Sequence, residues 1–305
     1  MSFTSIVKNE VSHLKTNKIE NISELSAIIK NIGTIDENIK IISENASLAR
    51  RIFNLIKDTY QITSKITVRK GYNFNKNLIY ILEINNKIKI KQIIEDLSIK
   101  NIPSKYIYED EELKKAYLRG LFLSTGSVND PKTSRYHLEF IVDTDEYAKF
   151  IVDLLNSYNL NSKILKRESK YMIYIKEAEK IGDFLRILQA INAVFYYEDI
   201  RIYRDHKNMT NRLNNCEQAN VDKIIETANK QISDIKKIQS NGLLDLLDEK
   251  TKETAIYRIK YPEVSLLELS EIITLETGNQ ITKSGLFHRL KKIENLANKF
   301  KKDNE

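Results

Sequence analysis

The 305-residue sequence is poor in the residues that cross-link or interrupt a chain: it has one cysteine, three prolines, eight glycines and no tryptophan. Cys216 is alone and cannot form an internal disulfide, and the four histidines lie too far apart in sequence to make the local cluster of a structural zinc site. So little proline and glycine, together with 41% hydrophobic residues, excludes a disordered or fibrous chain. We expect an ordered protein of two domains from a reducing compartment, without metal or cofactor.

Long apolar runs are also absent. No stretch approaches the roughly 20 consecutive apolar residues that a membrane-spanning helix requires. The N-terminal segment carries apolar side chains at helical spacing between lysines and a glutamate, whereas a signal peptide needs an uninterrupted apolar run. We therefore expect a cytoplasmic protein with no membrane partner.

The motifs of common hydrolytic sites are missing as well. The sequence has no glycine-rich phosphate loop, no HExxH, no nucleophile elbow and no paired histidines. Every usual route to hydrolysis is thus lacking, so we expect no catalytic residues and no enzymatic activity.

What the sequence does contain is an internal duplication. A shift of 98 residues carries one amphipathic helix onto another with the same apolar spacing, Ala49, Ile52, Phe53, Ile56 and Tyr60 onto Tyr147, Phe150, Ile151, Leu154 and Tyr158. The strand-like segment from Ser64 to Arg69 matches the segment from Ser162 to Arg167 at the same shift. The next apolar runs also match, with four residues fewer in the second intervening hairpin, and loops tolerate such changes.

A third matching piece lies upstream of each helix, at residues 25–33 and 118–126. Each piece predicts a helix with a small residue at its third position, Ala27 or Gly120, and a terminating glycine, which would let the two helices approach closely. Each repeat, about 20–100 and 112–200, then reads helix, strand pair, helix, strand pair, helix. We expect two open sheets, each covered on one face by helices, related by a pseudo-twofold axis.

This duplicated αββαββ unit resembles the LAGLIDADG homing-endonuclease fold. In active members of that family the acidic residue before each terminal glycine binds a divalent cation for phosphodiester cleavage. Ile32 and Thr125 stand at these positions, and neither supplies a carboxylate. Asp36 and Asp130 follow shortly after; a displaced metal site is one interpretation, but we expect turn residues.

Beyond residue 205 the composition changes. Residues 206–242 have apolar side chains near a helical period between many polar ones, which predicts one or two linker helices. The stretch 211–220 is rich in amides, which could contact phosphates or cap helices. We expect Cys216 within it to be a small buried filler, and Asn241 and Gly242 to form a turn.

The last sixty residues predict three helices. The first, over residues 254–259, stops before Pro262; Ser265 with Glu268 forms a capping box that opens the second; and Gly278 turns the chain into a third helix that opens at residues 281–284. This is the layout of a helix-turn-helix.

Charge singles out the final helix. The whole chain has 49 basic and 42 acidic residues, a net +7 that favours a polyanionic partner, and residues 281–302 hold seven of the cations with one anion. In a helix-turn-helix the second helix enters the major groove with its N-terminal side chains at base edges. The predicted DNA-binding residues are therefore Lys283, Ser284, His288 and Arg289 at base edges, with Lys291 and Lys292 at phosphates. The alternative is a solvated basic tail on a three-helix bundle.

Together, the degenerate duplication, the stretch 211–220 and the helix at 282–290 resemble the WhiA family of bacterial regulators over nearly the whole chain. The resemblance implies an α+β protein with a LAGLIDADG-like domain at 1–205, a helical linker at 206–242 and an all-α helix-turn-helix domain at 243–305. It also implies a nucleoid-associated transcriptional regulator that binds duplex DNA without cleaving it, with other transcription regulators as candidate partners. Such proteins are linked to sporulation, or to cell division and chromosome organisation. An active homing endonuclease and an RNA-binding maturase-like protein are the other functions considered.

Overall fold

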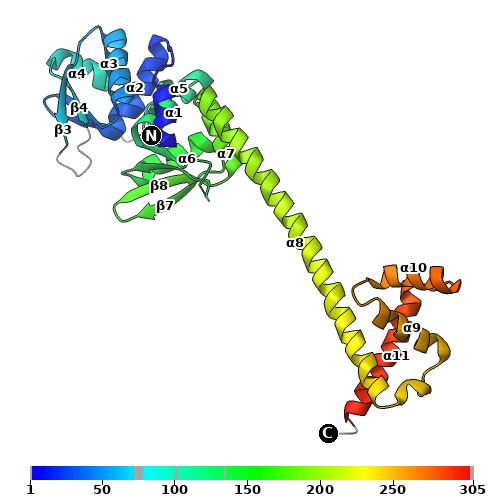
Figure 1. Ribbon diagram of the computed structural model, residues 1–305. Coiled ribbons are helices and arrows are strands. Elements are labelled where there is room, and N and C mark those ends of the chain that lie inside the picture. Colours follow the sequence, from blue (N-terminus) through cyan, green and yellow to red (C-terminus); the bar gives the residue numbers. More distant parts are fainter. Residues whose placement is uncertain (1, 72–77, 100–101, 134, 303–305) are drawn as a thin grey trace. The chain divides into compact units, whose positions relative to one another are not determined.

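The computed structural model describes residues 2–71, 78–99, 102–133 and 135–302 (Figure 1). The chain divides into two compact units, Met1–Asp205 and His206–Glu305. Each unit is described by itself below. None of the described helices is both long and apolar enough to cross a membrane.

The N-terminal unit contains the same series of elements twice, after a short helix α1 (Phe3–Val11). The first series is α2 (Lys18–Ile32), β1 (Gly33–Ile35), β2 (Ile39–Ser43), α3 (Ala46–Tyr60), β3 (Lys65–Lys70), β4 (Leu78–Ile84) and α4 (Lys87–Asp96). A short 3₁₀ turn, η1 (Lys105–Ile107), leads to the second series: α5 (Glu111–Thr125), β5 (Gly126–Val128), β6 (Leu138–Val142), α6 (Asp145–Asn156), β7 (Lys163–Arg167), β8 (Lys170–Ile175) and α7 (Ala178–Ile187). The predicted duplication and its order of helices and strand pairs are confirmed.

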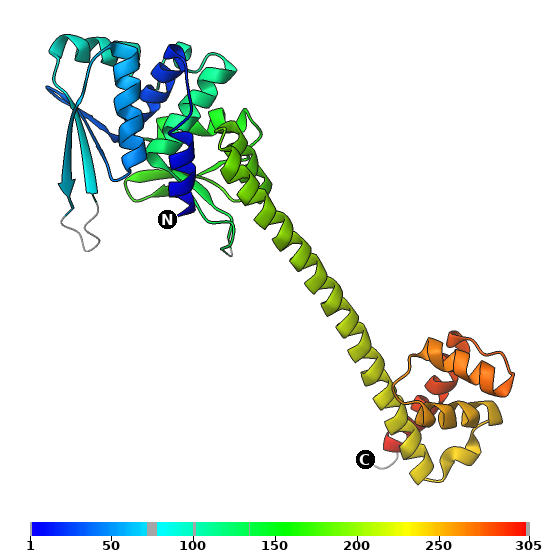
Figure 2. The same cartoon turned by 45° about the horizontal axis from the view of Figure 1, so that its top comes forward.

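Each repeat forms one four-stranded antiparallel sheet, with strand orders β1-β2-β4-β3 and β5-β6-β8-β7. Equivalent strands pair in equivalent register: Ile41 lies opposite Leu82 in the first sheet, and Phe140 lies opposite Ile173 in the second. All four side chains are buried, because alternate strand residues point toward the helices on one face. Figure 2 shows the helices of the first repeat gathered on one side of its sheet.

The two repeats meet along α2 and α5, whose facing side chains are fully buried. A Cβ atom added at Gly120 would lie 2.3 Å from the Glu24 carbonyl oxygen and 3.1 Å from Ala27 Cβ, so the predicted close approach at Ala27 and Gly120 is confirmed. Gly33 and Gly126 do end the two helices, but with φ of −89° and −71°, in extended backbone. Glycine is needed at both positions because a Cβ atom would collide with the last turn of the preceding helix. Neither glycine adopts the left-handed conformation of a common helix cap.

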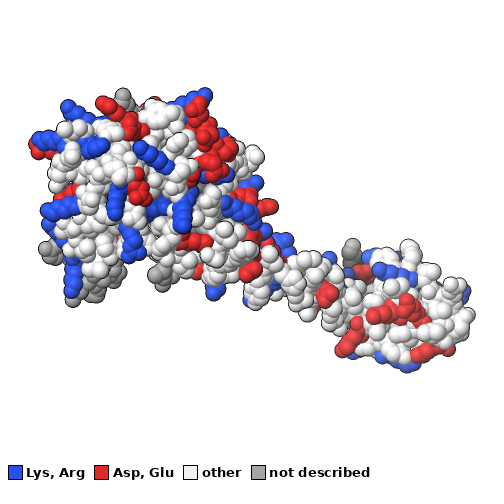
Figure 3. All heavy atoms as spheres, turned by 90° about the horizontal axis from the view of Figure 1, so that it is seen from above, with Lys and Arg blue, Asp and Glu red and all other residues white. Residues whose placement is uncertain are grey.

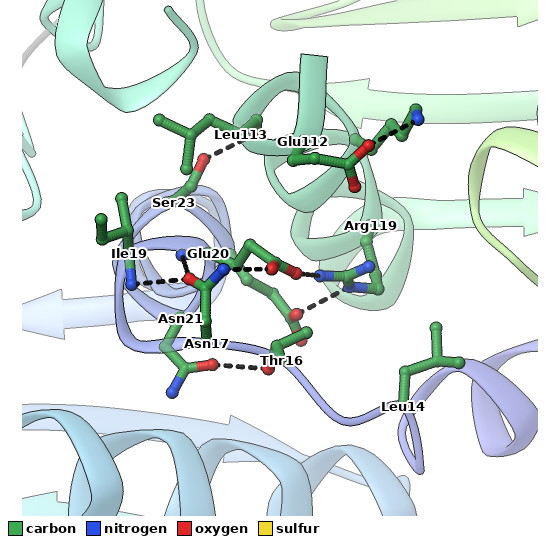
Figure 4. Close-up of polar contacts among 12 residues, drawn as sticks. Leu14, Thr16, Asn17, Ile19, Glu20, Asn21, Ser23, Glu112, Leu113 and Arg119 are labelled. Atoms are coloured by element: carbon green, nitrogen blue, oxygen red, sulfur yellow. Dashed lines mark hydrogen bonds and ion pairs between the residues drawn. The ribbon is translucent and has the colours of Figure 1, made fainter. Parts of the chain in front are cut away.

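A buried ionic cluster also joins the repeats. The Glu24 carboxylate, with no exposed surface, accepts hydrogen bonds from Arg51 Nε at 2.9 Å and from Arg119 Nε at 2.8 Å. Arg119, on α5, also pairs with Glu20, on α2, at 3.4 Å (Figure 4). Because a buried carboxylate that loses its partners is strongly destabilising, this cluster fixes how α2, α3 and α5 are placed.

Residues 206–240 belong to a single helix, α8 (Ile191–Ser240), which is 50 residues long and begins well before the change in composition. The prediction that Cys216 is a buried filler was wrong, because its side chain is exposed. The predicted turn at Asn241 and Gly242 is confirmed; Gly242 has φ +66°.

The C-terminal unit has the three predicted helices, α9 (Glu249–Lys260), α10 (Leu266–Thr277) and α11 (Lys283–Lys302), after a 3₁₀ turn η2 (Leu243–Leu246). One cluster of buried side chains joins the end of α8 to α9 and α11, and a second joins α10 to α11. The capping box of Ser265 and Glu268 is present, and Gly278 ends α10 with φ +72°.

Candidate nucleic-acid interface

The last helix, α11, has one buried face and one exposed face. Its apolar residues recur at i, i+4, i+7 and i+11, and this spacing places Leu286, Leu290, Ile293 and Ala297 in the core. Lys283, Ser284, Phe287, His288 and Lys291 are exposed. The core face fixes the rotation of the helix, so these exposed residues form a definite surface.

The start of α11 is fixed by hydrogen bonds to the turn. The Ile281 amide donates to Thr274 Oγ1 of α10 at 3.2 Å, and the Gly285 amide donates to Thr282 Oγ1 at 3.1 Å. Thr282 thus occupies an N-cap position. The base-reading end proposed from the sequence is therefore presented from an anchored helix start.

Lys283, Ser284 and His288 lie at this end of α11. Within the described parts of the chain, the side chains of these three residues have no hydrogen-bond or ion-pair partner. Their polar atoms face solvent and are available to a ligand.

Three of the six predicted residues do have partners. Arg289 Nη1 donates to the Lys250 carbonyl oxygen at 3.0 Å and to Thr254 Oγ1 at 3.2 Å, both on α9. Arg289 therefore helps to hold α9 against α11, a contact that its position in the cationic helix does not reveal.

Lys291 and Lys292 take part in ion pairs on the surface. Lys291 pairs with Glu294 at 2.8 Å, and Lys292 pairs with Asp248 at 3.4 Å. Hydrogen bonds from Lys230 and Lys291 lower the pKa of Glu294. Exposed pairs of this kind contribute about 0–1 kcal/mol, so a phosphate can displace the carboxylates at little cost.

The structure adds two residues that the sequence reasoning did not single out. Phe287 is 51% exposed beside Ser284 and His288, where an aromatic ring could meet a thymine methyl group. Lys223 of α8 lines the same groove as Lys283, a hollow of about 370 Å³ that also contains the first turn of α10. In the sequence, an aromatic residue among the cations of this helix could have pointed to Phe287, but no sequence pattern pointed to Lys223.

The ends of the two motif helices carry no acid. Ile32 is apolar, and the Thr125 hydroxyl donates to the Leu121 carbonyl oxygen at 3.2 Å. Asp130 accepts a hydrogen bond from the Lys132 amide at 2.9 Å, and the Asp36 amide donates to the Asn38 carbonyl oxygen at 3.2 Å, so both aspartates are turn residues as predicted. No group of three or more His, Cys, Asp or Glu side chains in the described ranges could hold a metal ion.

One face of the N-terminal unit carries charges of both signs (Figure 3). Figure 3 shows basic and acidic side chains interspersed over one face of Met1–Asp205, without a field of a single sign.

Three family models match the chain. The WhiA N-terminal LAGLIDADG-like domain matches residues 18–100, the WhiA LAGLIDADG-like domain matches 114–207 and the WhiA C-terminal HTH domain matches 210–297. The last match includes most of α8, all of α9 and α10, and α11 up to residue 297.

Whole-length relatives agree with these models. A protein of Oceanobacillus iheyensis named "Probable cell division protein WhiA" is 42% identical over 315 residues, covering 99% of this chain and 98% of the relative. One of the same name from Clostridium botulinum is 41% identical over 318 residues, covering 99% of both. The crystal structure of full-length WhiA from Thermotoga maritima has a TM-score of 0.59 at 26% identity, covering 98% of this chain and 99% of that one. The duplicated fold, the helix-turn-helix and these matches over the whole length establish that the chain belongs to the WhiA family.

Proposed function

We propose that this chain is a sequence-specific DNA-binding transcriptional regulator connected with cell division. The observation that carries the proposal is the exposed, unpartnered N-terminal end of α11, presented after a capped α10 and a glycine turn. The names of the relatives support the link to cell division. Sporulation and chromosome organisation are further processes that the family resemblance suggests.

In this proposal α11 lies in the major groove. Lys283, Ser284 and His288 meet base edges, because they are the side chains free at the start of the helix. Lys291 and Lys292 exchange their surface carboxylates for phosphates. Arg289 is shared between DNA and α9, since its Nη1 is engaged while its planar group has five donors in all.

Cleavage of the bound DNA is not part of the proposal. The two positions that carry metal-binding acids in active LAGLIDADG enzymes are Ile32 and Thr125 here. Without a carboxylate at either helix end, nothing at these positions can hold Mg²⁺ or Mn²⁺ for phosphodiester hydrolysis. The duplex is therefore held and not cut.

The proposal places the protein at the nucleoid, in the cytoplasm, where it would act with other transcription regulators. We propose for it the domain boundaries expected from the sequence: a LAGLIDADG-like domain to residue 205, a helical connection at 206–242 and a helix-turn-helix domain from 243. A chain that lacks residues 243–305 should lose site-specific binding.

The test maps the genomic sites occupied by the full chain and by a Lys283→Ala/His288→Ala double variant. We expect the double variant to lose the preferred sites, while a Lys236→Ala control on the exposed surface of α8 keeps them. Competition between equal lengths of duplex DNA and structured RNA completes the test. If RNA competes as well as the preferred duplex, an RNA-binding function replaces the proposed one.

A further inference from the structure

A hollow of about 770 Å³ opens in the N-terminal unit, beside α1, the first turn of α3 and strands β2 and β4. It also reaches the ends of the motif helices, at Ile32 of α2 and at Leu123 and Ser124 of α5. All of its lining residues belong to the described part of the chain, and none belongs to α11.

Lys8 of α1 is the one cation among the residues that line this hollow. Its ammonium has no hydrogen-bond or ion-pair partner among the described residues, and Nζ lies 5.7 Å from the centroid of the Phe122 ring. Burial lowers the pKa of Lys8 to about 8. A cation that is partly removed from water and left unpaired is costly, and an anion beside it would relieve that cost.

The rest of the lining suits an anion. On α1, the Ser5 hydroxyl and the Asn9 amide nitrogen can donate into the hollow. The other two lining hydroxyls are already engaged, because Ser47 donates to Asn9 Oδ1 and Ser124 donates to the Gly120 and Leu121 carbonyl oxygens. Glu44 is the one acidic residue that lines the hollow, and it is exposed. The first turn of the 15-residue helix α3 adds the positive end of its dipole, although Asn45 already accepts two of its amide hydrogen bonds.

We propose that this hollow binds the phosphate group of a small phosphate ester, with Lys8 as its charged partner. The ammonium of Lys8, with the Ser5 hydroxyl and the Asn9 amide on the same helix, matches the acceptor oxygens of a phosphate. The volume exceeds what one inorganic anion fills, which leaves room for the organic part of an ester. The site goes beyond the proposed DNA-binding function, because it shares no residue with α11.

The experiment uses the full chain with inorganic phosphate as the probe, against chloride at matched ionic strength. Calorimetric titration measures affinity, and the ¹³Cε shift of Lys8 followed against pH measures its pKa. We expect phosphate to bind and to raise the pKa of Lys8 above about 8, because a neighbouring anion favours the charged form. Lys8→Met should weaken binding about tenfold or more, whereas Lys8→Arg keeps most of it.

Lys57→Met, an exposed change on α3 outside the hollow, is the matched control and should bind phosphate as the unchanged protein does. Lys8→Met keeps an unbranched apolar side chain and removes a costly charge, so its melting temperature should not fall. Equal phosphate affinity in Lys8→Met and in the unchanged protein, or a Lys8 pKa that phosphate does not move, would overturn the proposal.

A second arm separates a free ester from a phosphate of the DNA backbone. Lys8→Met is expected to leave affinity for duplex DNA unchanged, whereas the α11 variants lose it. If Lys8→Met weakens duplex binding as much as it weakens phosphate binding, the hollow belongs to a DNA-contacting surface and the proposed small ligand is wrong. Loss of DNA binding in the α11 variants alone bears on α11 and leaves the hollow as proposed.

Discussion

The same substitution at two helical glycines should change stability in opposite directions. Gly120→Ala adds a Cβ that would lie 2.3 Å from the Glu24 carbonyl oxygen, a backbone atom of α2 that moves only if the helix moves. At Gly285 in α11, the nearest atoms to an added Cβ are side-chain atoms 3.5 Å away, which is ordinary contact. The two sites share the gain in helix propensity and differ in the space that surrounds them.

The magnitude at Gly120 follows from two terms. Replacing glycine by alanine inside a helix stabilises it by up to about 1 kcal/mol. Overpacking costs about 1–3 kcal/mol, and the upper end applies because the clash is with backbone and because moving Glu24 loosens its bonds to Arg51 and Arg119. The net expectation is a loss of about 2 kcal/mol, or about 4–8 °C in the melting of a unit of this size.

The assay is differential scanning calorimetry of the full chain, with the transitions of the two units assigned from a chain that lacks residues 243–305. Gly120→Ala should lower the transition of the N-terminal unit alone, and Gly120→Leu should lower it further. Gly285→Ala should raise that of the C-terminal unit by up to about 1 kcal/mol in stability. An unchanged or raised N-terminal transition in Gly120→Ala would refute the close packing of α2 on α5.

Four further predictions concern charge and chemistry. The protein should not cleave its bound duplex with Mg²⁺ or Mn²⁺, and specific double-strand breaks on a gel would contradict this. Lys283→Ala should reduce affinity for the preferred site by about 1–3 kcal/mol and leave affinity for random DNA nearly unchanged. Lys291→Ala should weaken binding to both kinds of DNA and reduce the slope of log affinity against log salt concentration by about 1. Fluorescence titrations at several salt concentrations measure these effects, and equal behaviour of the two variants would exclude separate roles for base and phosphate contacts. Arg289→Ala should lower the melting of the C-terminal unit as well as DNA affinity, since its guanidinium holds α9; an intact melting temperature would show that this contact contributes nothing. The pKa of Lys8 is about 8 in the folded chain and 10.5 ordinarily, so the unfolded chain binds more protons between these two pH values. Stability relative to Lys8→Met should therefore rise as pH increases from about 8 toward 10.5. Urea unfolding at several pH values should show that rise, and a flat difference would count against a partly buried, unpaired ammonium.

The order of elements could be predicted from the sequence because its signals are local. The apolar period fixed the faces of α3, α6 and α11, and the capping box of Ser265 and Glu268 fixed the start of α10. The match between the two repeats also predicted that the motif helices α2 and α5 pack against each other, because two copies of one pattern imply one shared interface. The fold class therefore required only local periodicity and the duplication.

The charged contacts could not be predicted in this way. Glu24 meets Arg51 and Arg119 across 27 and 95 positions of sequence, and no local pattern states which charges will share a buried space. From the sequence, Arg289 is predicted to face the DNA groove, yet in the structure its guanidinium donates to the Lys250 carbonyl oxygen of α9. The partner of a charge depends on which elements lie beside it, so only the packed structure shows it.

The sequence by itself determined the two repeats, the degenerate motif ends and the cationic final helix, because each follows from residue type and spacing along one segment. The tertiary structure decided which of the predicted DNA-binding side chains are free, that Cys216 is exposed on a continuous α8, and that Lys8 lies unpaired beside the ends of α2 and α5. These properties are exposures and distances between segments remote in the chain. Such quantities are set when the helices and sheets pack, and the spacing of residues within one element does not contain them.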